Sequence, residues 1–239
     1  MKQNENVDYL SVENQTFEDS VKFYFEENSK ALGSHKKGVL NKLRVLDTAR
    51  NLDLTIPDYI LSNSKNSIVK FLKEKGERVI IKPISDTATI QRNNKVYTTY
   101  TSEIIINDLH DANVRNYPVF CQQKIEKEFE IRSFYLDGKF SSMAIFSQME
   151  DTAIVDFRAS ENKKNVRRTP YILPEEVEQK LRKLMQAIGL NTGSIDLIQS
   201  TDGEIYFLEV NPAGQIGMTS TPCNYYLERQ IAKFLIGIE

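Results

Sequence analysis

Apolar residues recur at intervals of three and four positions along several stretches of the chain, the spacing of helices that bury one face. The predicted helices span residues 17–32, 42–52 and 67–75, a segment between Pro174 and Gly189, and a last segment capped by Ser220 or Thr221 with Pro222 at its first position. Asn41 is a suitable N-cap for the second of these helices. We expect the polar residues 1–15 to be frayed.

Short runs rich in β-branched and aromatic residues predict strands between these helices. The predicted strands cover residues 54–61, 78–84, 88–91, 96–101 and 119–125, a strand that turns at Asp137-Gly138 and returns over 140–146, and a hairpin within 193–218. The first strand contains Pro57, so it begins past that proline or lies at a sheet edge. Residues 104–118 are expected to be irregular. This order of helices and hairpins predicts a mixed α+β architecture with largely antiparallel sheets.

The hairpin within residues 193–218 is centred on Asp202-Gly203. An Asp-Gly pair between apolar runs favours a two-residue type I′ turn, because both of its central residues need positive φ. Such a turn places Thr201 opposite Glu204. Downstream, Gly214 and Gly217 would allow close approach of the backbone to a ligand.

Counting outward from that turn places Asp196 opposite Glu209, with Asn211 on the same face. Facing carboxylates repel each other unless a cation lies between them. Carboxylate and amide oxygens suit Mg²⁺ better than zinc or copper. The alternative is an ordinary hairpin with exposed acids.

Two lysines occupy positions that disfavour a positive charge. Lys42 falls in the first turn of its predicted helix, where it opposes the helix dipole. It is either a solvated lysine or a lysine directed at a bound anion. Lys82 lies in a buried strand pattern, so it needs a salt-bridge partner or an anionic ligand.

Charged side chains also alternate along the strand that precedes Asp137. Glu128, Glu130 and Arg132 share one face, which is either a solvated ion-pair network or the polar wall of a cleft. A basic run over residues 163–168 is either solvated or neutralises a phosphate or a peptide carboxylate.

Composition narrows the classes of function. The chain has 239 residues and a net charge of −2, which fits one large or two small globular domains and gives no sign of nucleic-acid binding. Two cysteines and two histidines nearly exclude a structural zinc site, and indicate reduced thiols in a cytoplasmic protein. The sequence shows neither a signal peptide nor an apolar run long enough to span a membrane.

One combination of residues, running from about Val39 to the C-terminus, resembles the ATP-grasp family. The combination consists of Lys42, Lys82, Gln123, Lys124, Ile125, Asp196, Glu209 and Asn211. The resemblance implies an ATP-grasp fold of two α+β subdomains with ATP between them. It implies that Lys42 and Lys82 bind the nucleotide, that residues 123–125 contact the adenine edge, and that Glu128 binds the ribose. Asp196, Glu209 and Asn211 would hold Mg²⁺.

Several motifs resemble more specifically the ribosomal peptide maturases that make graspetides, in their grasp-with-spasm branch. These motifs are Asn41-Lys42-Leu43, Glu130-Ile131-Arg132, Asp156-Phe157-Arg158, Arg168-Thr169-Pro170-Tyr171 and the segment LEVNPAGQIGM followed by PCNYYLE. The resemblance implies that Glu130 and Arg132 lie near the reacting acceptor and phosphate. It also implies that Arg158 and Arg168 stabilise the charge of the γ-phosphate and the acyl phosphate.

The activity implied is that of an ATP- and Mg²⁺-dependent ligase acting on a ribosomal precursor peptide with a leader. Asp or Glu side chains would be activated as acyl phosphates and joined to Thr, Ser or Lys side chains as ω-ester or ω-amide macrocycles. Two alternatives are an amino-acid-adding ligase that transfers glutamate and a non-catalytic module that binds nucleotide or leader peptide. The macrocyclising reaction needs no protein nucleophile, which fits the absence of any Ser/His or Cys/His pair in the sequence.

The chain departs from the family pattern at its start. Relatives carry an N-terminal α/β domain before a linker helix, whereas this chain begins almost at that helix. Either the chain is truncated or another chain covers the apolar stripe from Phe17 to Leu32, which makes a homodimer plausible. The stretch after Lys82 also lacks the glycines of many ATP-grasp phosphate loops. The expected division is a helical linker over 1–38, a central subdomain over 39–118 and a C-terminal subdomain over 119–239.

Overall fold

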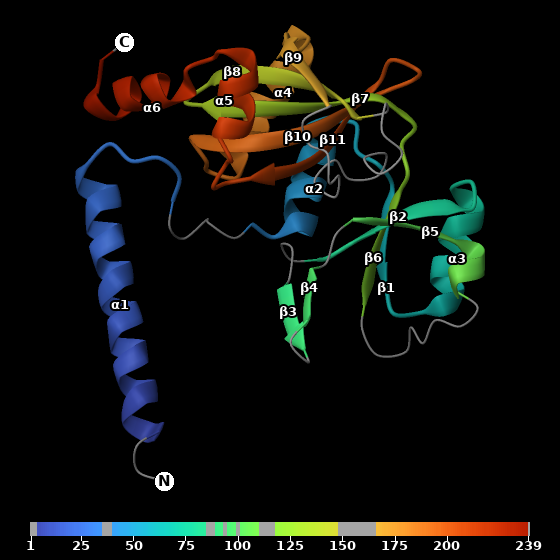
Figure 1. Ribbon diagram of the computed structural model, residues 1–239, viewed down its shortest axis with the longest axis horizontal. Helices are drawn as coiled ribbons and strands as arrows, with labels where there is room; N and C mark the ends of the chain where they lie inside the picture. Colours follow the sequence, from blue (N-terminus) through green and yellow to red (C-terminus); the bar gives the residue numbers. More distant parts are fainter. Residues whose placement is uncertain are drawn as a thin grey trace.

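The computed structural model describes residues 4–34, 40–84, 89–92, 95–98, 101–109, 118–147 and 166–238. These residues form a four-stranded sheet, a five-stranded sheet and a separate two-stranded hairpin. All strand pairs are antiparallel. Figure 1 shows the two larger sheets one above the other, with helix α1 standing apart from both. The α+β architecture predicted from the sequence is therefore confirmed.

The four-stranded sheet has the order β1-β6-β2-β5. Its strands are β1 (Tyr59–Ser62), β2 (Arg78–Lys82), β5 (Ser102–Ile105) and β6 (Val119–Gln123). Strand β1 begins past Pro57 and lies at the edge, as expected. Helix α3 (Lys65–Glu74) covers one face, where Ile68 and Leu72 are buried with Val79 and Cys121. The short 3₁₀ helix η2 (Ile106–Leu109) follows β5, so residues 104–109 are more regular than predicted.

The hairpin predicted after Lys82 is formed by β3 (Thr89–Arg92) and β4 (Lys95–Thr98). Its pairing aligns Gln91 with Val96. Of the predicted strand positions, 88, 99 and 100 lie outside the described residues.

The five-stranded sheet has the order β11-β10-β7-β8-β9. Its strands are β7 (Lys127–Leu136), β8 (Lys139–Phe146), β9 (Arg167–Tyr171), β10 (Thr192–Ser200) and β11 (Ile205–Asn211). Side chains alternate between its two faces, so each face has its own core. On one face Ile131 and Ile195 pack with buried residues of the helices α2 (Lys42–Asn51) and α4 (Glu175–Ala187).

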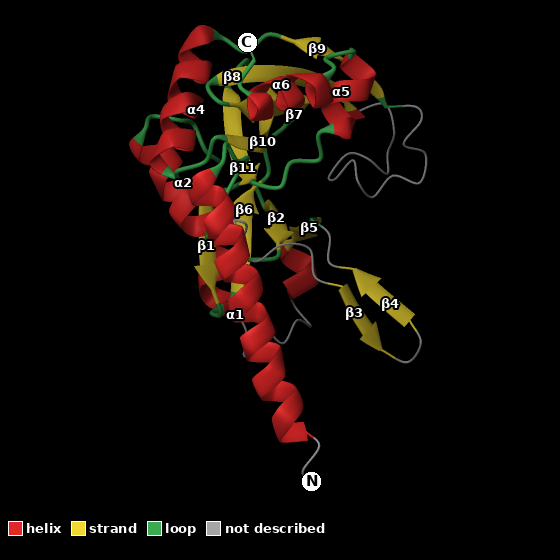
Figure 2. Cartoon of the chain, turned by 90° about the vertical axis from the view of Figure 1, so that its left-hand side faces the viewer, coloured by secondary structure: helices red, strands yellow, loops and turns green. Residues whose placement is uncertain are grey.

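The other face of this sheet is covered by α5 (Gly217–Cys223) and α6 (Leu227–Ile236). Figure 2 shows these helices on the side of the sheet away from α2 and α4. Met143 packs with Cys223 of α5, and Phe134 packs with Leu227 of α6. Full burial of each such apolar side chain contributes about 1.5–3 kcal/mol.

Two helix predictions are wrong in their bounds. Helix α1 covers Asn4–Asn28, so the residues from 4 to 15 are helical and the helix ends before residue 32. Side-chain hydrogen bonds from Gln15 to Asp19 and from Thr16 to the Val12 carbonyl, each one turn apart, accompany the helix through this polar segment.

The last helix starts later than predicted. Pro222 lies inside the short helix α5, and α6 starts at Leu227 after two residues with positive φ, Asn224 and Tyr226. Ser220 still acts at the start of α6, because its Oγ accepts a hydrogen bond from the Leu227 N–H at 3.0 Å.

The sheets divide the chain at a different point from the expected 118/119 boundary. Strand β6 belongs to the four-stranded sheet, and the five-stranded sheet begins with β7. Helix α2 packs on the five-stranded sheet although it was assigned to the central subdomain. We therefore propose a boundary within residues 124–126. No helix among the described ranges has the length and apolar character of a membrane span.

Candidate functional site

The predicted metal ligands come together on the β10–β11 hairpin. Asp196 is the cross-strand partner of Glu209, which confirms the register inferred from the sequence. Asn211 lies beside them, and its Nδ2 donates a hydrogen bond to Asp196 Oδ2 at 2.9 Å. The three side chains therefore offer carboxylate and amide oxygens within one small region of the sheet.

The register is as predicted, but the predicted turn is wrong. Gln199 pairs with Ile205 and the Ser200 N–H donates to the Glu204 carbonyl, so the loop is Thr201-Asp202-Gly203 rather than Asp202-Gly203 alone. This loop shifts the pairing by one residue. A β-bulge then follows, because Leu197 pairs with Phe207 whereas Asp196 pairs with Glu209. The bulge inserts Leu208 and restores the predicted alignment.

Each of the facing carboxylates has a basic partner. Arg132 Nη1 lies 3.2 Å from Asp196 Oδ1, and Lys42 Nζ lies 3.5 Å from Glu209 Oε2. The exposed fractions of these four side chains are 6% and 22% for the first pair and 17% and 22% for the second. Partly buried pairs are screened less than surface pairs. The repulsion between the carboxylates is therefore offset by the protein itself, and a metal ion is not required to explain their proximity.

Lys42 connects the two sheets. Asn41 caps helix α2 as predicted, since its side chain accepts a hydrogen bond from the Arg44 N–H at 3.0 Å. Lys42 Nζ, on the first turn, also donates to the Pro83 carbonyl at 3.2 Å. Lys42 thus contacts the end of β2 in one sheet and β11 in the other. Of the two sequence alternatives, the freely solvated lysine is excluded.

Lys82 is the last residue of β2 and pairs with Phe120 of β6. It is half-buried, and it directly precedes Pro83, whose carbonyl binds Lys42. The structure therefore brings the two predicted nucleotide lysines to the same end of β2.

The predicted adenine hinge, residues 123–125, begins at the last residue of β6 and leads toward β7 of the other sheet. The Gln123 N–H donates to the Asp58 carbonyl at 2.7 Å, and Lys124 Nζ lies 3.0 Å from Glu103 Oε2. The Thr201 N–H donates to the Glu126 carbonyl, so the hinge is also attached to the metal-site hairpin.

The charged face of β7 divides into an exposed and a buried part. Glu128 is exposed, as on a solvated sheet face. Glu130 forms an ion pair with Lys127, and Arg132 is 5% exposed beside Asp196. The buried Nε of Arg132 has no hydrogen-bond partner within the described part of the chain. Glu130 and Arg132 therefore fit the wall of a polar site better than a solvated network.

The remaining predicted arginines are only partly accounted for. Arg168 lies on β9 opposite Ile145, is half-buried, and its Nη1 donates to the Val166 carbonyl at 3.4 Å. Arg158, with Asp156, Lys163 and Lys164, lies outside the described residues.

The two glycines expected to allow close approach of a ligand differ in their surroundings. A Cβ on Gly214 would meet Ser194 Oγ at 3.2 Å, so its close approach is to β10. Gly217 has no heavy atom within 4 Å of such a Cβ. The contact at Gly214 places its backbone beside the candidate metal ligands, because Ser194 is the cross-strand partner of Asn211.

Sequence reasoning missed several buried hydroxyl groups in the five-stranded sheet and in the helix α5 that covers it. Ser194 Oγ and Thr219 Oγ1 are buried and have no hydrogen-bond partner among the described residues. Ser133 and Ser142 hydrogen-bond each other at 2.7 Å. The sequence signal for these groups was the presence of serines within apolar strands. Such serines indicate a polar partner, because a strand interior seldom buries a hydroxyl group without one.

The donor set fits a hard divalent cation. In the described ranges no three His, Cys, Asp or Glu side chains gather to hold a metal, because this site has two acids and one amide. Oxygen donors alone are nevertheless the ligands that Mg²⁺ prefers. The Nδ2 of Asn211 is directed at Asp196, which leaves its Oδ1 as the donor toward an ion.

The thiols do not offer a nucleophile. Burial raises the pKa of Cys121 to about 11, and burial also raises the pKa of Cys223. Both thiols are therefore protonated at neutral pH.

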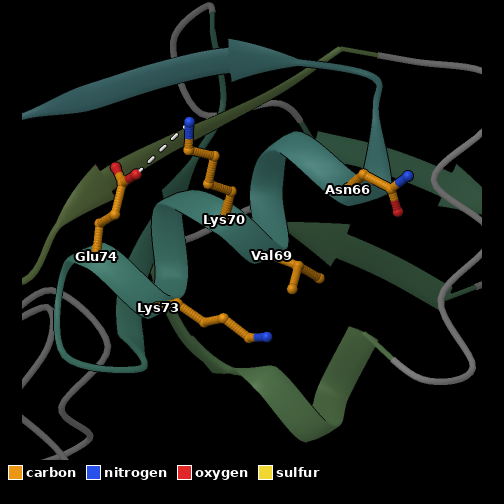
Figure 3. Close-up of a pocket in the computed structure, with 5 residues that line it drawn as sticks. All are labelled: Asn66, Val69, Lys70, Lys73 and Glu74. Carbon is orange, nitrogen blue, oxygen red and sulfur yellow. Dashed lines mark ion pairs between the residues drawn. The ribbon is translucent and has the colours of Figure 1, made fainter.

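Two hollows on the described surface lie away from these residues. One of about 490 Å³ runs along α3 and is lined by Asn66, Val69, Lys70, Lys73 and Glu74. Figure 3 shows Lys70 paired with Glu74 across it, while Lys73 points elsewhere. None of the predicted site residues lines this hollow, so we assign no ligand to it.

The fold is similar to that of several solved structures. One is an ATP-grasp ligase of Chryseobacterium gregarium, associated with ribosomal peptides and in complex with ADP and a leader and core peptide. It has a TM-score of 0.81 and 20% identity, over 96% of this chain and 70% of that chain. The ATP-grasp ligase PsnB, complexed with a precursor variant, Mg and ADP, has a TM-score of 0.77 and 18% identity, over 98% of this chain and 72% of that chain.

A third similar structure has higher sequence identity. It is the macrocyclase MdnC of Microcystis aeruginosa, bound with the precursor peptide MdnA. It has a TM-score of 0.70 and 31% identity, over 82% of this chain and 61% of that chain. This chain thus spans less than two thirds of the macrocyclase. No family model and no curated protein sequence matches the chain.

Proposed function

We propose that this chain is an ATP-grasp ligase of the ribosomal peptide maturase type and that it joins side chains of a precursor peptide at the expense of ATP, because its fold is similar to the folds of such ligases. A side-chain carboxylate of Asp or Glu would attack the γ-phosphorus and release ADP. The hydroxyl of Thr or Ser, or the amine of Lys, would then attack the acyl carbon and release phosphate. The peptide loses one water for each ω-ester or ω-amide bond formed.

The observation that carries the proposal is the convergence of Lys42, Asp196 and Glu209 at the junction of the two sheets. Asp196, Glu209 and Asn211 would hold Mg²⁺, which would supply positive charge to neutralise nucleotide phosphates. Lys42 would exchange its contact with Glu209 for a phosphate oxygen. Lys82, at the same end of β2, would add a second positive charge there.

The remaining roles follow from position. Residues 123–125, at the junction of the sheets, would hold the adenine through backbone groups, and the exposed Glu128 would bind the ribose. Arg132, held by Asp196, would offset charge that develops on the transferred phosphoryl group. Arg168 and Arg158 would share that role, and Glu130 would lie near the acceptor.

The structural neighbours support this choice of substrate class. One is bound to ADP with a leader and core peptide, and another to a precursor peptide. We infer that this chain also recognises a leader and that a second copy of the chain is a further partner. ATP and newly made peptides are both available in the cytoplasm, where we place the reaction.

Mass spectrometry of a precursor peptide rich in Thr and acidic residues, incubated with the protein, ATP and Mg²⁺, tests the proposal. Loss of one water per bond supports macrocyclisation. A gain of one amino-acid residue mass would instead indicate an amino-acid-adding ligase. An unchanged peptide, with nucleotide still bound, would indicate a binding module and overturn the proposed activity.

A further inference from the structure

A buried ion pair at the start of β7 includes a lysine to which the proposed reaction assigns no role. Lys127 Nζ pairs with Glu130 Oε1, and the exposed fractions of the two side chains are 6% and 13%. Burial removes both charges from water, and their attraction offsets that cost only where the geometry is good. A buried ion pair is therefore weak evidence for a stabilising role, and its place in the wall of the candidate site favours a functional one.

A β-bulge brings the two side chains to the same face of the sheet. Residues three positions apart in a regular strand point to opposite faces. Phe129 pairs with Gln199 of β10, and Lys127 pairs with the residue after Gln199. Glu128 is therefore an extra residue in β7, and this reverses the face toward which Lys127 points. The strand departs from regular pairing at the place where Lys127 meets Glu130.

The carboxylate of Glu130 is held from two strands. Its Oε1 pairs with Lys127 on β7 and accepts a hydrogen bond from Ser147 Oγ at 3.5 Å. Ser147 is 1% exposed and directly follows the end of β8. Donors from both strands thus fix one oxygen of the carboxylate, which restricts its rotation.

The oriented carboxylate lies next to the candidate metal ligands. Arg132 is two residues further along β7, so its side chain points to the same face as that of Glu130. Arg132 Nη1 lies 3.2 Å from Asp196 Oδ1. Glu130 is therefore the neighbour, on one face of β7, of the arginine that contacts the metal-site hairpin.

We propose that Lys127 is a positioning residue of the proposed reaction, on which this inference rests. Lys127 holds the Glu130 carboxylate in the orientation in which it meets the acceptor hydroxyl or amine of the peptide. A small displacement of a group beside the reacting atoms slows the chemical step, because the reacting groups are then misaligned. Loss of Lys127 should therefore lower kcat, and the loss should depend on the presence of Glu130.

Steady-state kinetics of peptide modification by Lys127→Met test the proposal, with Lys180→Met as the matched control. Lys180 forms a similar ion pair with Glu176 on α4, a helix that contains none of the proposed site residues. Lys127→Met should lower kcat at least about tenfold, while the KM for the peptide and the affinity for ADP change less than about threefold. Lys180→Met should match the wild type. If Lys127→Met keeps the kcat of the wild type, the proposal is wrong.

A double-variant cycle separates positioning from a structural role. Glu130→Gln should lower kcat to a similar extent, and adding Lys127→Met to it should lower kcat no further, because Lys127 acts through Glu130. Losses that multiply in the double variant, or an ADP affinity that falls together with kcat, would overturn the proposal. If Lys127→Met does not unfold cooperatively, Lys127→Gln replaces it under the same criteria.

The wild type distinguishes this inference from the proposed function. A wild type that leaves the peptide unchanged would overturn both. A wild type that removes water from the peptide, together with a Lys127→Met variant of equal kcat, would overturn the positioning role alone.

Discussion

At the scale of single residues, the site depends on how charges are compensated. Arg132 and Lys42 each pair with one carboxylate of the facing pair, so the repulsion between Asp196 and Glu209 is offset. Lys42 also contacts Pro83, which no sequence pattern could have predicted, because the two residues are joined only by the tertiary fold. The same contact makes Lys42 sensitive to the relative position of the two sheets.

Cys121 allows a pH prediction at this scale. Burial raises its pKa from 9.0 to about 11, so the folded state retains the thiol proton more strongly than the unfolded chain. This contribution to stability is fully present below about pH 8.5–9 and is lost as the pH rises toward about 11. Urea unfolding at increasing pH should therefore show a steeper loss of stability for the wild type than for Cys121→Ala. Parallel pH profiles for the two proteins would contradict the assignment.

At the scale of elements, two Asp-Gly turns show how far local sequence can be trusted. Asp137 and Gly138 form a two-residue turn with φ of 46° and 91°, and Leu136 pairs with Lys139. Asp202-Gly203 forms part of a longer loop instead. Ser200 explains the difference, because its Oγ accepts from the Glu204 N–H at 3.1 Å and lies 2.8 Å from the Glu204 carbonyl. The dipeptide predicts a hairpin, but neighbouring side chains determine its loop.

The pairing of Asp196 with Glu209 was therefore predicted correctly, although the two-residue turn from which it was counted was wrong. The alternation of apolar residues along β10 and β11 requires their buried faces to coincide, and the bulge at Leu208 compensates for the extra loop residue. The helix α2 was predicted well because its cap and its apolar face are both local signals. The bounds of α1 were not, because its side chains from residue 9 to residue 20 are all exposed and so give no pattern of burial.

Helix α2 provides an element-scale prediction. Asn41 caps α2 and Ser64 caps α3, and each side chain accepts a hydrogen bond from an N–H three residues later. Replacing either by Ala should lower the free energy of unfolding by about 1 kcal/mol. Asn41→Ala should also weaken ADP binding several-fold, because Lys42 follows the cap directly. Calorimetric titration of ADP into both variants checks this, with Ser64→Ala as the control that leaves Lys42 untouched. Equal ADP affinities for Asn41→Ala and Ser64→Ala would refute the role of Lys42.

At the scale of the whole molecule, two sheets meet along a boundary that the proposed ligands cross. Lys42 bridges it through its contacts with Pro83 and Glu209, and residues 124–126 connect its two sides. The sequence predicted both sheets and the candidate metal face. It did not predict that β6 joins the first sheet or that α2 packs on the second, because these are long-range packing choices.

The central claim is that the face formed by Asp196, Glu209 and Asn211 binds a nucleotide through Mg²⁺. The most direct measurement is calorimetric titration of ADP into the protein with Mg²⁺ and with EDTA, for the wild type and for Glu209→Gln. Glu74→Gln, which alters a surface ion pair on α3, serves as the control. The wild type and Glu74→Gln should bind ADP at least about tenfold more tightly with Mg²⁺, equivalent to about 1.4 kcal/mol. Glu209→Gln should lose that difference while keeping its fold. Equal affinity with Mg²⁺ and with EDTA in the wild type, or an undiminished Mg²⁺ effect in Glu209→Gln, would contradict the claim.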